Sequence, residues 1–276
     1  MIGKIALLAG IVSLFALFAG VMAAFYINRD NIYYLLNKNP EEISPEKTPD
    51  TSGPIPAPTV NDAAAPLPDA IFDPYEYFSN IFFLGDSILF GFDGYRDSIE
   101  FDGEKVLKDA AVAASVGYGV NHAVADIADN SVNLIYGGKA MRPEDIVAQR
   151  GEKYVFICLG LNDLVFMSIE EYIEAYIMLI ENIQAKNPDK TVVILSVTPL
   201  VAGKTGGSMD NGVIITANYM LLEYAADCDI QFLDWGAAVR DDDNMALRED
   251  LSSDGYCHLT IEAYNRLAGY LLEHPV

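Results

Sequence analysis

Four short blocks of this chain combine glycine with side chains that can carry out acyl-transfer chemistry. A serine hydroxyl becomes a nucleophile when a nearby base takes its proton, and histidine titrates near neutral pH. A backbone amide at a glycine turn and an asparagine side-chain amide can both stabilise the oxyanion that then forms. In chain order the blocks are Gly85-Asp86-Ser87, Ser115-Val116-Gly117-Tyr118-Gly119, Gly160-Leu161-Asn162-Asp163 and Asp254-Gly255-Tyr256-Cys257-His258.

Alternating strand and helix patterns would position these blocks. Apolar runs typical of buried strands cover residues 80–85, 110–115, 153–160, 191–199 and 230–235. Helical patterns cover residues 168–188, 212–228 and 260–274, and the first opens with a Ser168–Glu171 capping box. Strands that are apolar on both faces and alternate with helices predict an α/β fold, a doubly wound, flavodoxin-like three-layer α/β/α sandwich on a five-stranded parallel sheet. Sites in such folds lie at the carboxyl ends of the strands, so we expect the four blocks to converge there.

The four blocks resemble those of the SGNH, or GDSL-type, hydrolase superfamily, whose fold is a three-layer α/β/α sandwich. The resemblance makes Ser87 the nucleophile and His258 the general base. It implies an oxyanion hole formed by Ser87, Gly117 and Asn162, with Gly119 as the alternative to Gly117. Such an enzyme is a serine esterase or lipase, and we expect no metal and no cofactor.

The acid behind the histidine is the point at which the chain departs from the family pattern. The family usually places its acid three residues before the histidine, where this chain has Gly255. Asp254 lies four residues before His258, so a one-residue bulge would be needed to bring its carboxylate to the imidazole. The alternatives are a Ser–His dyad without an acid, or Asp250 as the acid.

Other polar residues near the blocks have simpler interpretations. His122 is the rival base, but it lies at a predicted helix start and not beside an acid. His274 is expected to interact with a helix end. Asp86 and Asp163 are expected to hydrogen-bond within turns. Three tyrosines in predicted loops are candidates to line a substrate groove: Tyr95, Tyr118 and Tyr136.

The N-terminal segment predicts a membrane anchor. The residues from Ile5 to Ile27 carry no charge, and at about 1.5 Å per residue they would span roughly 34 Å, enough to cross a bilayer. We interpret residues 1–36 as a transmembrane anchor with its flank. A signal peptide cleaved near Val21-Met22-Ala23 is the alternative. Because Lys4 makes the N-terminal flank positive, we expect the remainder of a single-pass protein to lie outside the cytoplasm.

Two further segments complete the predicted organisation. Eight prolines between Pro40 and Pro68 predict an extended linker over residues 37–70. The hydrolase domain would then span residues 71–276. With 51% hydrophobic residues the chain can build one substantial core, and its net charge of −23 argues against a nucleic-acid partner. The three cysteines, expected to be small buried residues, show no zinc-binding spacing: Cys158, Cys228 and Cys257.

The sequence therefore predicts an extracytoplasmic, membrane-tethered serine esterase that works through an acyl-enzyme. Its location suggests two substrate classes, the O-acetyl groups of a cell-envelope glycan or a lipid ester. Two alternatives stay open. One is an acyltransferase of the same fold, and the other is a catalytically silent binding module of the cell envelope.

Overall fold

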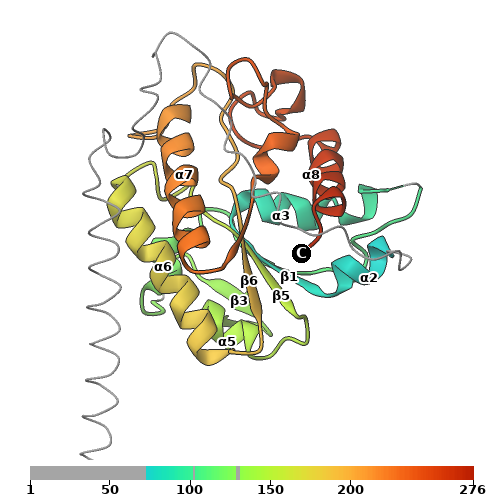
Figure 1. The fold of residues 1–276 in the computed structure, drawn as a ribbon, viewed down its shortest axis with the longest axis vertical. Helices are drawn as coiled ribbons and strands as arrows, with labels where there is room; N and C mark the ends of the chain where they lie inside the picture. The colour runs from blue at the N-terminus through green and yellow to red at the C-terminus, as the bar shows by residue number, and fades with distance from the viewer. Residues whose placement is uncertain (1–72, 102, 129–130) are drawn as a thin grey trace, which may run out of the picture. The chain divides into compact units, whose positions relative to one another are not determined.

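A computed structural model describes residues 73–101, 103–128 and 131–276 (Figure 1). Its main sheet has five parallel strands in the order β2-β1-β5-β6-β7, which is the order of flavodoxin-like folds. The strands of this sheet are β1 (Ile81–Gly85), β2 (Ala111–Ala114), β5 (Tyr154–Cys158), β6 (Thr191–Leu195) and β7 (Gln231–Leu233). The predicted fold class is confirmed, and each strand lies inside the range that its apolar run predicted.

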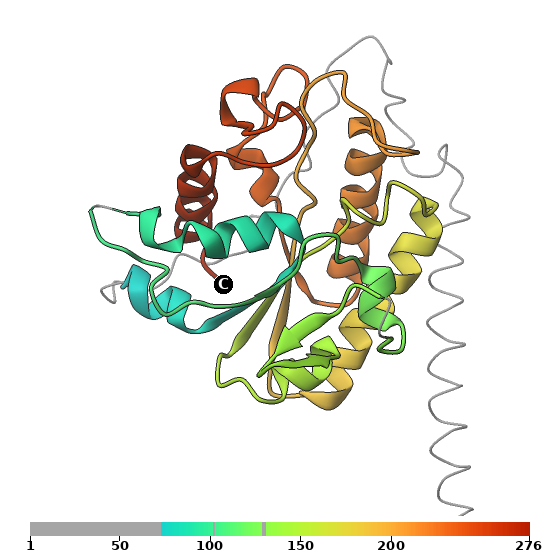
Figure 2. The ribbon, with the colours of Figure 1, turned by 180° about the vertical axis from the view of Figure 1, so that it is seen from behind.

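Helices cover both faces of this sheet (Figures 1 and 2). One face carries α6 and α7, which pack against each other, and α4 and α5 pack against α6. The other face carries α3, which contacts β1 and β2, together with α8. The helices are α2 (Pro74–Ser79), α3 (Ser87–Gly94), α4 (Val120–Val124), α5 (Pro143–Val147), α6 (Ile169–Lys186), α7 (Asn211–Asp227) and α8 (Ile261–Glu273), with short 3₁₀ turns at Arg96–Ser98, Trp235–Ala238 and Glu249–Leu251.

The three long helices that the sequence predicted are present and begin at side-chain caps. The Ser168–Glu171 capping box opens α6, as its sequence predicted. Asp210 accepts a hydrogen bond from the Val213 amide at the start of α7, and Thr260 caps α8. These caps satisfy amides that a helix N-terminus leaves unpaired, and so define where each helix begins.

The first helix after β1, α3, was not predicted. Its sequence, SILFGFDG, contains two glycines and few strong helix formers. It forms because Asp86 caps it and because Phe92 packs in the core, with its ring 5.4 Å from Phe83 and 6.1 Å from Trp235. Packing against the sheet therefore outweighs weak helix propensity and fixes the start of α3.

A small antiparallel hairpin lies between β2 and β5 in the chain. It consists of β3 (Leu134–Tyr136) and β4 (Lys139–Met141) and precedes α5. The sequence did not predict β3, β4 or α5, because they lie in a segment with neither a long apolar run nor a helical periodicity.

The predicted anchor over residues 1–36 and the linker over residues 37–70 lie outside the described residues. In the part of the chain that the structure describes, every helix is too short or too polar to cross a membrane.

Candidate active site

Ser87, His258 and Asp254 form a continuous chain of side-chain contacts. Ser87 is the first residue of α3, immediately after the end of β1. Its Oγ lies 3.2 Å from Nε2 of His258, and Nδ1 of the same imidazole lies 2.6 Å from Oδ2 of Asp254. A hydroxyl, an imidazole and a carboxylate in this order have the geometry of a nucleophile, its base and an orienting acid.

The turn before α8 explains how Asp254 reaches the histidine despite its unusual spacing. Its Oδ1 accepts hydrogen bonds from the backbone amides of Tyr256, Cys257 and His258, at 2.8, 3.1 and 3.2 Å. The carboxylate thus closes its own turn, and Oδ2 remains for the imidazole. The other candidate acid, Asp250, pairs instead with Arg248 at 2.7 Å.

Hydrogen bonding also keeps the Asp254 carboxyl ionised. Partial burial acts to raise the pKa of Asp254, but the hydrogen bonds from the His258 ring and from the Tyr256 and His258 amides lower it to about 2. The carboxylate is therefore charged throughout the neutral range. In this state it can accept a hydrogen bond from Nδ1–H and leave the Nε2 lone pair directed at Ser87.

Asp86 fixes the helix start that presents Ser87. Its Oδ1 accepts a hydrogen bond from the Ile88 amide at 2.9 Å, as an N-cap does. Burial raises the pKa of Asp86 to about 7, although the Ile88 amide lowers it, and the nearby carboxyl of Asp163 raises it further. The expectation that this residue hydrogen-bonds within the turn is confirmed.

The second and third blocks meet beside the end of β1. In the sheet register, Gly85 pairs with Ala114 on one side and Cys158 on the other, so three strands end together. The Ser115 amide donates to the Gly85 carbonyl at 3.3 Å. The Asn162 side-chain amide donates to the Tyr118 carbonyl at 2.9 Å, so the three blocks lie next to one another.

Gly117 and Asn162 are therefore brought to the strand ends where Ser87 lies. Gly117 has a φ of +77°, a backbone conformation that favours glycine, and it forms the turn between β2 and α4. The two donors, a backbone amide and a side-chain amide, are of the types that an oxyanion hole uses. That Gly117 and Asn162 form an oxyanion hole stays a prediction.

Asp163 joins the second block to the third. Its fully buried carboxylate accepts hydrogen bonds from the amides of Val120 and Asn121, at 3.0 and 3.2 Å, at the start of α4. A Cβ added to Gly119 would lie 2.3 Å from Oδ1 of Asp163, so only glycine permits this approach. Burial raises the pKa of Asp163, and the two amides act to lower it.

The loop after β6 also takes part in positioning the site, which no sequence motif had indicated. The Val201 amide donates to the Tyr256 carbonyl at 2.8 Å, in the turn that holds His258. The Ser208 amide donates to the Val165 carbonyl at 3.0 Å, three residues after Asn162. Because these are backbone contacts, the side chains gave no signal by which they could be predicted.

The remaining predicted residues lie apart from this contact chain. The His122 ring stacks on Tyr118 at 6.0 Å within α4, while His258 holds the contact to Ser87. His274 ends α8, and its Nδ1 lies 2.9 Å from the Tyr270 carbonyl.

One groove prediction is wrong. Tyr118 is only 2% exposed, because its ring is packed in the core and stacked on His122, so it cannot line an open groove. Tyr95 packs against Tyr264, and the Tyr136 hydroxyl accepts from Arg150 at 3.2 Å.

The cysteines are all free, and only two of them behave as expected. Cys158 and Cys257 are buried, whereas Cys228 is exposed at the end of α7. In the described part of the chain, one group combines three metal-ligand types, and it lies in the turn before α8: Asp254, Cys257 and His258.

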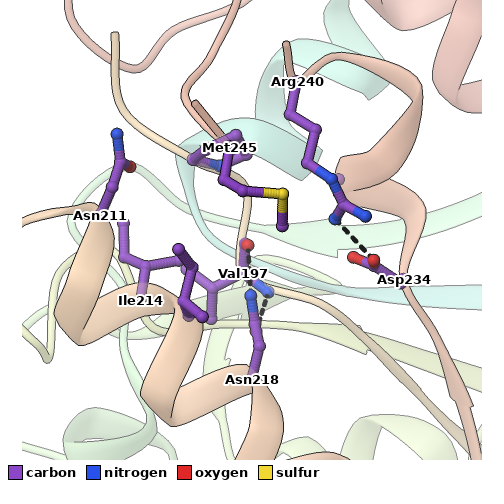
Figure 3. A pocket seen from close by; sticks show the side chains of 10 residues that line it. Val197, Asn211, Ile214, Asn218, Asp234, Arg240 and Met245 are labelled. Carbon is purple, nitrogen blue, oxygen red and sulfur yellow. Dashed lines mark hydrogen bonds and ion pairs between the residues drawn. The ribbon is translucent and has the colours of Figure 1, made fainter. Parts of the chain in front are cut away.

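A cavity near the ends of β6 and β7 is separate from these residues (Figure 3). Its volume is about 20 Å³, which is room for a single water molecule. Asp234 and Arg240 form a buried ion pair in its wall at 2.5 Å. None of the predicted site residues lines it.

Comparison with known proteins shows the family to which the chain belongs. A family described as "GDSL-like Lipase/Acylhydrolase family" matches residues 83–266, which is more than half of the 276 residues. The chain belongs to this family. The match includes every residue of the Ser–His–Asp chain as well as Gly117 and Asn162. No curated protein matches the chain.

Two solved structures have a fold similar to that of this chain. A GDSL-like lipase from Bacteroides thetaiotaomicron VPI-5482 is 16% identical, with a TM-score of 0.53 over 70% of this chain and 86% of that one. A protein of Bacteroides fragilis NCTC 9343 assigned as an acylhydrolase is 17% identical, with a TM-score of 0.53 over 70% and 85%. At such identities the likeness establishes the fold alone.

Proposed function

We propose that this family member is a serine hydrolase that cleaves a carboxylic ester through an acyl-enzyme on Ser87. The observation that carries the proposal is the contact chain from the Ser87 hydroxyl through His258 to the Asp254 carboxylate. A silent binding module has no need for a base 3.2 Å from a half-buried serine, so the contacts among Ser87, His258 and Asp254 favour catalysis.

The geometry suggests the following first half-reaction. Nε2 of His258 accepts the Ser87 proton as Oγ attacks the ester carbonyl carbon, and the Asp254 carboxylate stabilises the imidazolium that results. The amides of Ser87 and Gly117 and the Asn162 side chain are the proposed donors to the oxyanion. When the tetrahedral intermediate collapses, the ester C–O bond breaks and the alcohol leaves with the proton from Nε2.

The second half-reaction repeats these roles with water. His258 takes a proton from the water, the hydroxyl attacks the acyl-enzyme, and Ser87 leaves with the proton that His258 returns. An acyltransferase would use a second alcohol in place of water at this step. The described contacts are compatible with both hydrolysis and acyl transfer. Hydrolysis needs only water as the acyl acceptor, whereas acyl transfer needs a second alcohol.

Three exposed apolar side chains favour an ester with an apolar acyl group over an acetyl ester. Phe90 lies one helical turn after Ser87 on α3, and Val116 directly precedes Gly117. Phe166 follows Asn162 by four residues. These side chains are 53%, 61% and 62% exposed, and burying them against an acyl chain would remove apolar surface from water.

The proposed location is outside the cytoplasm, on a membrane anchor. Its support is the uncharged run from Ile5 to Ile27 and the preceding Lys4. Alkaline carbonate washing of membranes tests it. An anchored protein stays in the membrane pellet, whereas a cleaved, secreted protein or a cytoplasmic one does not.

Hydrolysis of aryl esters by the full-length protein tests the proposed function. Ser87→Ala should lower kcat by at least about 10³-fold, because no other group can form the acyl-enzyme. Ser79→Ala, which removes a half-buried hydroxyl at the end of α2, is the matched control and should keep the wild-type rate. The apolar-acyl proposal predicts a higher kcat/KM for an octanoyl ester than for an acetyl ester. Equal rates for wild type and Ser87→Ala would contradict the proposed function.

A further inference from the structure

The turn before α8 holds a third ligand-type side chain against the imidazole. Sγ of Cys257 lies 3.9 Å from Nδ1 of His258, the same nitrogen that contacts Oδ2 of Asp254 at 2.6 Å. All three atoms lie within 4.8 Å of one another. The proposed hydrolysis uses the aspartate and the histidine, and it gives the cysteine no role.

The additional residue in this turn is what places the sulfur there. Because Asp254 lies four residues before His258, the turn must close over one more residue than the family spacing contains. The Asp254 carboxylate accepts the Cys257 amide at 3.1 Å, which fixes the cysteine backbone beside the imidazole. Cys257 is buried, with 6% of the residue exposed, while the Asp254 and His258 side chains are 37% and 47% exposed.

This combination of atoms suits a soft divalent metal ion. A thiolate, an imidazole nitrogen and a carboxylate are the ligands of zinc sites, with Zn–S near ~2.3 Å and Zn–N near ~2.1 Å. Two such bonds at a tetrahedral angle separate sulfur from nitrogen by about 3.6 Å, close to the separation in this turn. Magnesium and calcium prefer oxygen ligands only and do not fit this set.

Metal binding and the proposed catalysis compete for the same nitrogen. Zinc bonds to oxygen and nitrogen would separate Oδ2 from Nδ1 by about 3.4 Å, so the 2.6 Å contact between them has to open. The single proton of the neutral imidazole would then lie on Nε2, because the metal occupies Nδ1. With a proton already bound, Nε2 cannot accept the one from Ser87.

We propose that Asp254, Cys257 and His258 form an inhibitory site for Zn²⁺ and similar soft divalent ions. On binding, the Cys257 thiol releases its proton to solvent and Sγ, Nδ1 and Oδ2 ligate the ion, with water in the fourth position. The ring proton moves from Nδ1 to Nε2, and the Ser–His relay stops until the ion leaves. The inhibition rests on the proposed role of His258, whereas the binding itself does not.

The test combines inhibition with a direct signal of binding. Full-length protein is titrated with Zn²⁺ during ester hydrolysis, and each variant is scored relative to its own metal-free rate. Cys257→Ser should need at least 10-fold more Zn²⁺ for half-inhibition than wild type. Cys228→Ser, which alters the exposed cysteine, should behave as wild type, and a chelator should restore the rate.

Binding of Co²⁺ provides the second readout, through the near-ultraviolet charge-transfer absorption of a thiolate–cobalt bond. Wild type, Cys228→Ser and the inactive Ser87→Ala should all show this band, and Cys257→Ser should lack it. The Ser87→Ala result separates a failure of this proposal from a failure of the proposed function. Absence of the band in unaltered protein overturns the metal site even if Cys257 variants do not fold. Equal Zn²⁺ inhibition of wild type and a folded Cys257→Ser also overturns it.

Discussion

Two regions at the carboxyl ends of the strands use polar side chains in opposite ways. Beyond β1 and β5, the imidazole of His258 is 47% exposed and contacts a half-buried hydroxyl. Beyond β6 and β7, the Arg240 and Asp234 side chains are only 10% and 5% exposed, and they pair with each other (Figure 3).

The second region satisfies its polar groups internally. The Asn218 side chain bonds both the amide and the carbonyl of Val197, at 2.7 and 2.9 Å, just after β6 ends. The Asn211 side chain does the same for Leu200. Such buried contacts hold the chain in place, whereas the Ser87 contact chain lies where a substrate can reach it. Solvent access to the contact chain, and not the presence of polar residues, separates the candidate site from the structural region.

Loss of the acid in the first region should have a large effect on catalysis. Asp254→Asn should lower kcat by roughly 10²- to 10⁴-fold, because an amide favours the wrong imidazole tautomer. Asp250→Asn, which alters the rival acid of the same turn region, should keep the wild-type rate. Steady-state kinetics at neutral pH measure both. A loss below about 10-fold for Asp254→Asn would favour a Ser–His dyad.

The second region should respond in stability and not in catalysis. Asp234→Ala leaves the Arg240 charge buried without its partner, which should lower the free energy of unfolding by about 3–5 kcal/mol. The kcat of the folded protein should stay within a few fold of wild type. Urea unfolding followed by fluorescence measures the first quantity. Glu262→Ala, which breaks an exposed pair with Arg266, should cost less than about 0.5 kcal/mol. A large fall in kcat with little loss of stability would show that the second region takes part in catalysis.

The buried acid that starts α3 should make the stability depend on pH. The pKa of Asp86 is raised from 3.8 to about 7 in the folded protein, so between these values the folded state binds more protons than the unfolded state. Stability from this group is therefore present below about pH 4 and lost as pH rises toward 7, at up to about 1.4 kcal/mol per pH unit. Asp86→Asn keeps an N-cap acceptor and should remove this loss.

Urea midpoints at pH 5 and pH 8 for both proteins measure the Asp86 effect. Wild type should lose more stability between the two values than Asp86→Asn does. Parallel pH profiles would show that Asp86 does not titrate in this range.

The sequence predicted the elements whose patterns are long or marked by caps. All five sheet strands and the three long helices follow from apolar periodicity, and the Ser168–Glu171 pair marked where α6 begins. The sequence did not predict α3. This helix depends on Phe92 packing against Phe83 and Trp235, a contact made only after folding. The sheet topology then explains why residues 171 positions apart, Ser87 and His258, meet.

The acid could not be assigned from spacing alone. Asp254 reaches the imidazole because its other oxygen is bonded by three backbone amides, and backbone amides carry no sequence signature. The same limit applies to the contacts of Val201 and Ser208 after β6. Tyr118 was misplaced because a glycine-rich turn suggests an exposed loop, whereas its ring is stacked on His122 in the core.

Covalent labelling of the full-length protein with a fluorophosphonate tests whether Ser87 is an activated nucleophile. The reagent reacts with a serine only when a base activates it, and intact mass and peptide mapping locate the adduct. We predict one adduct per chain, on Ser87, that is lost in Ser87→Ala and strongly slowed in His258→Ala. Folded wild-type protein that stays unlabelled, or that is labelled at another residue, would contradict the account.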